Sequence, residues 1–382
     1  MSKYKSFSVH QTIYKCRRAI AAVTAGITAA ALPLAVLGVG AVGAAIFKVS
    51  QFSASMMVPA STSQSEVILP QEESVASEEP VSSEDESVKK SSGGNDTQTS
   101  STESEETVSS EQEETTDSDR GKVKEVQIKN SGVNYGNVYV KDGNSNYDAN
   151  IKQLLASSAN CKIKKNASYQ VLLVHTHTTE GYADSDKDWY SKSTNPRTTD
   201  KSESVVAVAD EIEKQLNAAG IKTLHVTTYH DYPEYTGAYN RARETIKSYL
   251  KKYPSIEMVI DVHRDSMTQD DGTKLKPTVT INGKKAAQVM IISGCDNDGK
   301  LNFSGWRDNL IIATQLQKQM ADDYEGLARP LYFAPFRYNM DLTPNSLLIE
   351  FGTDVNTLEE ATYSGKLVGQ SLVKVLEKYV VN

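Results

Sequence analysis

The distribution of charged and apolar residues along the 382-residue chain limits where a hydrophobic core can form. Residues 49–122 are largely serine, glutamate, threonine and glutamine, and between residues 61 and 119 there are 17 acidic side chains against Lys89 and Lys90, a net charge of about −15. Such a segment cannot bury enough apolar surface to offset the entropy lost on ordering, and its like charges repel one another. We therefore predict a disordered acidic linker at 49–122 and a folded domain at 123–382.

The residues before this linker have the pattern of a membrane anchor. Residues 1–18 carry five basic and no acidic side chains, and no charged residue occurs from Ala19 to Phe47. At 1.5 Å per residue, this stretch is long enough to cross a hydrocarbon core of roughly 30 Å, and the basic flank places the N-terminus in the cytoplasm. A cleaved signal peptide is the alternative, although its apolar region usually has only about 7–15 residues. We predict a cytoplasmic tail at 1–18 and a retained transmembrane helix at 19–48.

The charge and cysteine content of the folded part exclude two kinds of site. The net charge of −8 arises in the acidic linker, whereas residues 120–382 carry a net charge of about +1 and show no basic stripe of the kind that binds nucleic acid. The chain contains no Cys-x-x-Cys motif, so we expect no zinc-finger type of structural site. Cys161 and Cys295 would both be extracytoplasmic, and the sequence leaves open whether they form a disulfide.

Segments typical of strands and helices alternate through the folded part. In one helix, apolar residues recur at intervals of three and four from Val205 to Ala219, Asp200 is a suitable N-cap, and Gly220 a suitable end. This alternation predicts an α/β domain in three layers, with a mostly parallel sheet covered on both faces. The expected strands are 138–140, 170–175, 222–227, 257–263, 278–281, 288–293, 330–334 and 346–351, and the other expected helices are 241–252, 308–323 and 358–379.

Side chains that can bind a metal ion follow two of these strands. His177 and Glu180 come directly after the strand at 170–175, and His263 ends the strand at 257–263. Because the carboxyl ends of neighbouring parallel strands lie at one edge of a sheet, these side chains are expected to meet there. A catalytic zinc ion takes three nitrogen or oxygen ligands from the protein and keeps one position open. We predict that His177, Glu180 and His263 are the zinc ligands.

Three alternatives for this site remain open. His175 and His177 point to the same side of their strand, so His175 is an alternative ligand, although the His-x-x-Glu spacing favours His177. Glu203, in the first turn of the predicted helix, is an alternative to Glu180, and the helix dipole is another reason for an acid there. The pair His230-Asp231 either forms a turn or lines the rim of a groove.

Two further residues are candidates for the chemistry itself. Glu350 lies in the apolar strand 346–351, where a carboxylate is costly to bury without a partner, and near a metal it would be a suitable general base. Arg264, beside His263, would hold a substrate carboxylate or stabilise an oxyanion. Asp261 or Asp265 would accept a hydrogen bond from a ligand imidazole.

Four segments, in this order, resemble the stage II sporulation protein P family of spore-forming Firmicutes: Val174–Glu180, His230–Pro233, Ile260–Asp265 and Leu348–Gly352. The resemblance covers roughly residues 165–382 and the layout of anchor and linker, while the linker itself shows no family motif. It implies a phosphorylase/hydrolase-like amidase fold and a zinc-dependent N-acetylmuramoyl-L-alanine amidase. Such an enzyme is a hydrolase that cleaves the amide between muramic acid and L-alanine in peptidoglycan. In related amidases the zinc carboxylate commonly comes from a helix start, which keeps Glu203 open.

The resemblance also implies a cellular role. It places the chain in the cell membrane, with its catalytic domain between the mother-cell and forespore membranes, and implies cell wall degradation during forespore engulfment, together with stage II sporulation proteins D and M. Some members are reported to act as endopeptidases as well. The alternatives to an amidase are therefore a zinc endopeptidase or carboxypeptidase acting on the stem peptide, and a non-catalytic scaffold that binds the cell wall.

Overall fold

The computed structural model describes residues 118–143 and 147–381. The predicted cytoplasmic tail at 1–18, the predicted transmembrane helix at 19–48 and the predicted linker up to residue 117 lie outside the described residues. Within the part that is described, none of the helices combines the length and the apolar character needed to cross a membrane.

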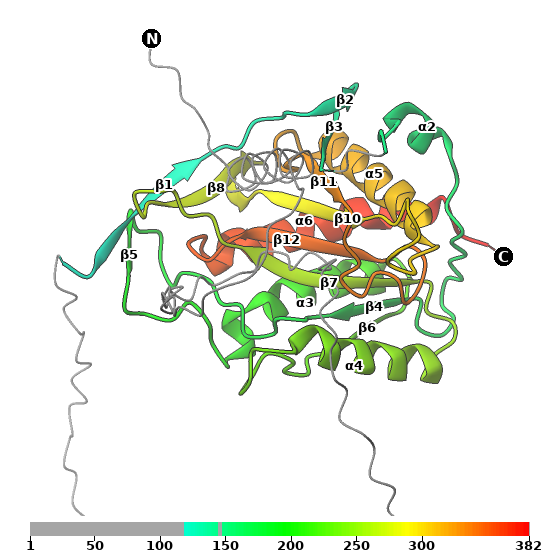
Figure 1. The fold of residues 1–382 in the computed structure, drawn as a ribbon, viewed down its shortest axis with the longest axis horizontal. Coiled ribbons are helices and arrows are strands. Elements are labelled where there is room, and N and C mark those ends of the chain that lie inside the picture. The colour runs from blue at the N-terminus through cyan, green and yellow to red at the C-terminus, as the bar shows by residue number, and fades with distance from the viewer. Residues whose placement is uncertain (1–117, 144–146, 382) are drawn as a thin grey trace, which may run out of the picture. The chain divides into compact units, whose positions relative to one another are not determined.

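A mixed sheet of eight strands forms the centre of the domain (Figure 1). Five of its seven neighbouring strand pairs are parallel, which confirms the prediction of a mostly parallel sheet, and the pairs β10–β12 and β2–β3 are antiparallel. In spatial order the strands are β2 (Val133–Tyr135), β3 (Val138–Asp142), β11 (Leu331–Ala334), β10 (Val289–Gly294), β12 (Leu347–Thr353), β7 (Met258–Asp265), β4 (Val171–Val174) and β6 (Thr223–His225).

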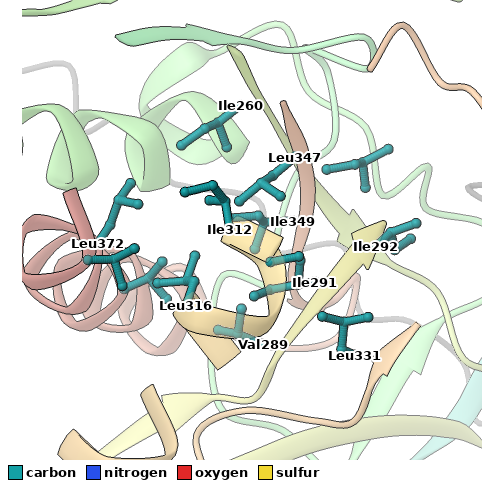
Figure 2. Close-up of a cluster of buried hydrophobic side chains, with 14 of the residues drawn as sticks. Ile260, Val289, Ile291, Ile292, Ile312, Leu316, Leu331, Leu347, Ile349 and Leu372 are labelled. Atoms are coloured by element: carbon teal, nitrogen blue, oxygen red, sulfur yellow. The ribbon is translucent and has the colours of Figure 1, made fainter. Parts of the chain in front are cut away.

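Helices cover both faces of this sheet and give the predicted three layers. On one face lie α3 (Val205–Ala218), α5 (Trp306–Asp323) and α6 (Leu358–Glu377), with the short α2 (Ile151–Ala156) against α5, and on the other lies α4 (Ala238–Lys252). Alternation along β4 separates two apolar clusters, because Val171 and Leu173 join the larger cluster and Leu172 and Val174 join the one beneath α4. Figure 2 shows part of the larger cluster, where strand residues such as Ile260 and Ile349 meet Ile312 and Leu316 of α5.

Two glycines of α6 allow it to approach α3 closely. A Cβ atom added at Gly365 would lie 2.6 Å from the carbonyl oxygen of Val208, and one added at Gly369 would lie 2.9 Å from Cβ of Gln215. Both distances are too short for a side chain, so the backbone of α6 packs against the backbone of α3 at Gly365 and against the Gln215 side chain at Gly369.

A second sheet of four strands was not foreseen as a unit. Its spatial order is β5 (Trp189–Ser191), β1 (Arg120–Val126), β8 (Lys274–Ile281) and β9 (Lys284–Ala287). The strand expected at 278–281 is the second half of β8. Strand β1 begins at Arg120, three residues before the predicted start of the folded part, because it pairs with both β5 and β8.

The start of α3 and the state of the cysteines were less certain from the sequence. Asp200 caps a short 3₁₀ helix, η1 (Lys201–Glu203), and Ser204 caps α3 itself, one turn later than expected. Gly220 follows α3 with a φ of +76°, as expected for the end of a helix. Cys161 and Cys295 are both buried and do not form a disulfide.

Candidate active site

Three neighbouring strands bring the predicted site residues to one edge of the central sheet. Strand β7 is parallel to both β4 and β12, so their carboxyl ends lie together. His263 on β7 is directly opposite Glu350 on β12. Beyond β4 the chain turns, and the backbone N–H of Glu180 donates to the carbonyl oxygen of His177 at 3.2 Å.

The structure places His177, Glu180 and His263 in one buried cluster. Nδ1 of His263 lies 3.3 Å from Oε2 of Glu180, and the rings of His177 and His263 are 5.4 Å apart and nearly perpendicular. None of these three residues is more than 4 % exposed. Geometry therefore agrees with the grouping predicted from the sequence, while metal binding by these residues stays a prediction.

Several buried polar atoms of this cluster lack a hydrogen-bond partner among the described residues. They are Nδ1 of His177, Nε2 of His263 and Oε2 of Glu350. Buried polar atoms are nearly always satisfied in folded proteins, and two imidazoles with a carboxylate are the donors that zinc prefers. The residues therefore fit a zinc ion in their chemistry. The possible ligand atoms of His177, Glu180 and His263 are farther apart than in a compact metal site. Among the described residues, the group whose three ligand atoms all lie within 4.8 Å of one another is Asp210, Glu213 and His225.

Burial and neighbouring charges shift the pKa values of the cluster in opposite directions. Burial raises the pKa of Glu350 well above its ordinary value, against the opposing effect of His263. Burial also acts to raise the pKa of Glu180, but His263 and His177 outweigh it and hold this pKa well below its ordinary value. Burial lowers the pKa of His177 to about 4. At neutral pH, Glu180 is thus an anion beside a neutral His177, and Glu350 holds a proton readily. Asp261 and Glu180 outweigh burial and raise the pKa of His263 well above its ordinary value, so this ring would release a proton on binding a metal.

The two alternative ligands lie elsewhere. Nδ1 of His175 donates to the carbonyl oxygen of Val262 at 3.0 Å, and its Nε2 lies 2.8 Å from Nε2 of His225. Glu203 is exposed, and its carboxylate lies 3.5 Å from Oγ1 of Thr198. Neither residue is in contact with His263 in the way that Glu180 is, so the geometry favours His177 and Glu180.

One of the two aspartates considered from the sequence lies beside His263. Asp261 lies 2.9 Å from Nε2 of His263, although not in hydrogen-bonding geometry, and it accepts hydrogen bonds from the backbone N–H and the hydroxyl of Thr176 at 2.8 and 2.6 Å. Asp265 instead accepts a hydrogen bond from Arg329 at 3.0 Å. Of the two aspartates considered from the sequence, Asp261 is the one placed to orient His263.

The pair His230-Asp231 is buried, so it is more than a surface turn. Nδ1 of His230 donates to the carbonyl oxygen of His175 at 2.6 Å. Asp231 accepts from the backbone N–H and the hydroxyl of Thr179 and lies 3.9 Å from Nδ1 of His177. These contacts anchor the turn that carries His177.

Two residues at the site were missed from the sequence. Arg197 donates to Asp231 at 2.7 Å, and its other terminal nitrogen lies 3.7 Å from Glu180. The ring of Tyr235 stacks on His177 at a centroid distance of 4.8 Å, and the guanidinium of Arg197 lies 4.7 Å from the centre of the Tyr235 ring. Both residues come from irregular segments between elements, where no periodic pattern marks a position as functional.

The contacts of Arg264 place its guanidinium against backbone carbonyl oxygens, and the catalytic role expected for it stays a prediction. The side chain is buried, Nε donates to the carbonyl oxygen of Gly181, and Nη2 donates to the carbonyl oxygen of Pro196 at 2.8 Å. Its backbone N–H donates to Oε2 of Glu180 at 3.0 Å. A guanidinium engaged by backbone carbonyls in this way holds the Glu180 segment in place.

Strand β12 changes its pairing just after Glu350. Its register with β7 shifts between Glu350 and Thr353, and Gly352 has a φ of +65°. A Cβ atom at Gly352 would lie 2.5 Å from Oδ1 of Asn356 and 2.8 Å from Cβ of Ala287. The chain therefore changes direction sharply here, and only glycine fits the position.

The chain is similar to a curated relative and to solved amidase structures. A relative named stage II sporulation protein P, from Bacillus subtilis strain 168, is 31% identical over 208 residues, which are 50% of this chain and 47% of that protein, so the chain spans about half the length of this curated relative. The CwlD amidase from Clostridioides difficile, solved in complex with the GerS lipoprotein, is 12% identical, covers 55% of this chain and 98% of its own, and has a TM-score of 0.34. The N-acetylmuramoyl-L-alanine amidase AmiC2 of Nostoc punctiforme is 10% identical, covers 56% and 97%, and has a TM-score of 0.31.

The family model described as stage II sporulation protein P matches residues 50–373. This match begins well before residue 165, where the resemblance in the sequence was placed, and it takes in the predicted linker. Because it extends over most of the 382 residues, the chain belongs to the stage II sporulation protein P family.

Proposed function

We propose that this chain is a zinc-dependent N-acetylmuramoyl-L-alanine amidase that cleaves peptidoglycan during forespore engulfment. The observation that carries the proposal is the buried cluster of His177, Glu180, His263 and Glu350 at one sheet edge, in a chain of a sporulation family. Amide hydrolysis needs an activated water, a stabilised oxyanion and a proton for the departing nitrogen. The cluster contains groups suited to each requirement.

His177, Glu180 and His263 would hold the zinc ion. When bound, zinc lowers the pKa of a coordinated water and polarises a carbonyl group. Asp261 restrains the His263 ring, and Arg264 restrains the backbone that follows Glu180. These supporting contacts matter because a metal site depends on fixed ligand orientations as well as on the ligands.

Glu350 would move the proton. Its carboxyl group is buried, one of its oxygens has no hydrogen-bond partner in the described part of the chain, and burial raises its pKa above the ordinary value. A cation held beside it by the other three residues would favour the ionised carboxylate, which is the form that accepts a proton. Glu350 takes a proton from the attacking water. It then delivers that proton to the alanine nitrogen as the bond from the lactyl carbonyl carbon to this nitrogen breaks.

The test of this role is Glu350→Gln in the purified full-length protein. We expect the variant to keep its fold and metal content and to lose about 10²–10⁴-fold in turnover of purified sacculi, because only the proton transfer is removed. Glu359→Gln, an exposed position on α6, is the matched control and should retain full turnover. Wild-type turnover by Glu350→Gln would rule out the proposed base.

The products identify the bond that is cleaved. Mass spectrometry of digested sacculi should find stem peptides that begin with a free alanine, together with intact glycan strands. An endopeptidase or carboxypeptidase would leave the alanine attached to muramic acid. A non-catalytic scaffold would release no peptide, and its binding to sacculi would be unchanged by His177→Ala.

We further propose that residues 19–48 anchor the chain in the cell membrane and that the domain acts outside the cytoplasm together with stage II sporulation proteins D and M. The uncharged stretch and its basic flank support the anchor, and the family supports the sporulation setting. Fractionation of sporulating cells tests this proposal, because the full chain should stay in the membrane pellet after high-salt washing, and a chain that lacks residues 1–48 should not.

A further inference from the structure

A second group of metal-binding side chains lies on the α3 side of the sheet, apart from the candidate active site. Asp210 and Glu213, three residues apart on α3, face His225 at the end of β6. Nδ1 of His225 lies 2.9 Å from Oδ1 of Asp210 and 3.8 Å from Oε2 of Glu213. One ligand atom from each residue lies within 4.8 Å of the other two.

The hydrogen-bond partners behind His225 determine where its ring carries a proton. Nδ1 of His175 faces the carbonyl oxygen of Val262 at 3.0 Å, and since a carbonyl can only accept, this nitrogen carries a proton. Nε2 of His175 faces Nε2 of His225 at 2.8 Å, so one proton lies between them. His175 is fully buried, and a second proton would make it a buried cation. The shared proton therefore belongs to Nε2 of His225.

This arrangement directs Nδ1 of His225 at two carboxylates. An imidazole whose second nitrogen is fixed from behind is the usual state of a histidine that binds a metal. Here the fixing partners, His175 and Val262, lie outside the group of possible ligands. In the structure, Nδ1 of His225 forms a hydrogen bond with Oδ1 of Asp210 at 2.9 Å, and a divalent ion would take the place of the proton in this bond. Imidazole nitrogen with two carboxylates is a donor set that zinc and related divalent ions accept.

The surroundings also allow an ion to enter. The side chain of Asp210 is 62% exposed, whereas that of His225 is 5% exposed, so the group opens to solvent on the carboxylate side only. Oε1 of Glu213 accepts a hydrogen bond from Asn217 at 3.3 Å, which leaves Oε2 turned toward His225. Solvent water can complete the coordination, as in zinc sites that have three protein ligands.

We propose that Asp210, Glu213 and His225 bind a divalent cation of the zinc type, separate from the metal proposed for the active site. The bound ion would tie α3 to β6, and β6 neighbours the strand that leads to His177. This proposal does not depend on the proposed amidase activity, because it rests on a different set of residues.

The experiment measures zinc binding by the chelator-stripped full-length protein, with isothermal titration and elemental analysis. In Asp210→Asn and in Glu213→Gln, the affinity at this site should be at least about tenfold weaker, since even a change to a residue that only supports a metal ligand costs about 10–100-fold. Each variant should therefore hold one zinc ion fewer at the concentration that fills the wild-type site. Glu211→Gln removes the same charge from the same helix, where Glu211 faces Lys214 and not His225, and should bind as wild type does.

The count of zinc ions separates this proposal from the amidase proposal. If both hold, the wild type binds two ions and Asp210→Asn binds one. If only the second site exists, the wild type binds one ion and Asp210→Asn binds none. Asp210 is exposed, so the variant should keep the wild-type circular dichroism spectrum. Unchanged zinc stoichiometry in both variants, or ring signals of His225 that zinc leaves unmoved in NMR spectra, would overturn the proposal and leave a proton between the ring and the carboxylates.

Discussion

The contacts of Arg264 predict a loss of stability when its guanidinium is removed. In Arg264→Met, the hydrogen bonds to the carbonyl oxygens of Gly181 and Pro196 disappear, and the replacement fills similar space. Hydrogen bonds from a charged donor contribute about 1.5–3 kcal/mol each, so the two bonds account for about 3–6 kcal/mol. Since the variant no longer buries a charge, part of this loss is regained. We expect the free energy of unfolding to fall by about 3 kcal/mol.

Urea unfolding of the full-length protein, followed by tryptophan fluorescence, measures this change. Arg264→Lys should fall between wild type and Arg264→Met, because lysine keeps the charge but cannot reach two carbonyls with a rigid fork. Arg337→Met is the control, since Arg337 is 43% exposed and its contact with Asp341 at 3.6 Å should contribute less than about 1 kcal/mol. If Arg264→Met unfolds at the wild-type urea concentration but loses turnover, the guanidinium acts on the substrate and the structural assignment is wrong.

Two other predictions test the packing and the support of the site. Gly365→Ala places a Cβ atom 2.6 Å from the carbonyl oxygen of Val208, and the cost of about 1–3 kcal/mol should exceed the gain of about 1 kcal/mol in helix propensity, so the melting temperature should fall. Gly305→Ala meets only Pro344 at 4.0 Å and should lower the melting temperature less, because it changes only the N-cap of α5, and equal melting of both variants would contradict the packing argument. Asp261→Asn should weaken zinc binding at the active site about 10–100-fold by loosening His263, and an unchanged affinity would show that Asp261 does not orient the ring.

The sequence predicted the parts of the site that depend on regular structure. His177, Glu180, His263 and Glu350 all follow or lie within apolar runs of strand length, and parallel pairing of β4, β7 and β12 brings such positions to one edge. The grouping of these four residues could therefore be predicted from the apolar runs and from the rule that the carboxyl ends of neighbouring parallel strands lie together.

What the sequence did not predict depends on contacts between distant irregular segments. The acceptors of Arg264 are 68 and 83 residues away in the chain. The position of Arg264 beside His263 in the sequence therefore did not indicate where its side chain points. Arg197 and Tyr235 lie in connections without periodicity. Strand β1 has no apolar run that would mark it in the sequence, and Gly121 is its one buried residue. Its partner β8 lies about 150 residues further along the chain.

The glycine two residues after Glu350 makes the position of the proposed catalytic carboxyl depend on backbone shape. Gly352 has no reactive atom, yet any side chain there would collide with Asn356 and Ala287 and displace the end of β12. A survey of inactivating substitutions would therefore rank this position beside Glu350 itself. In this chain, then, intolerance to change does not by itself distinguish a residue that performs chemistry from one that sets the path of the backbone.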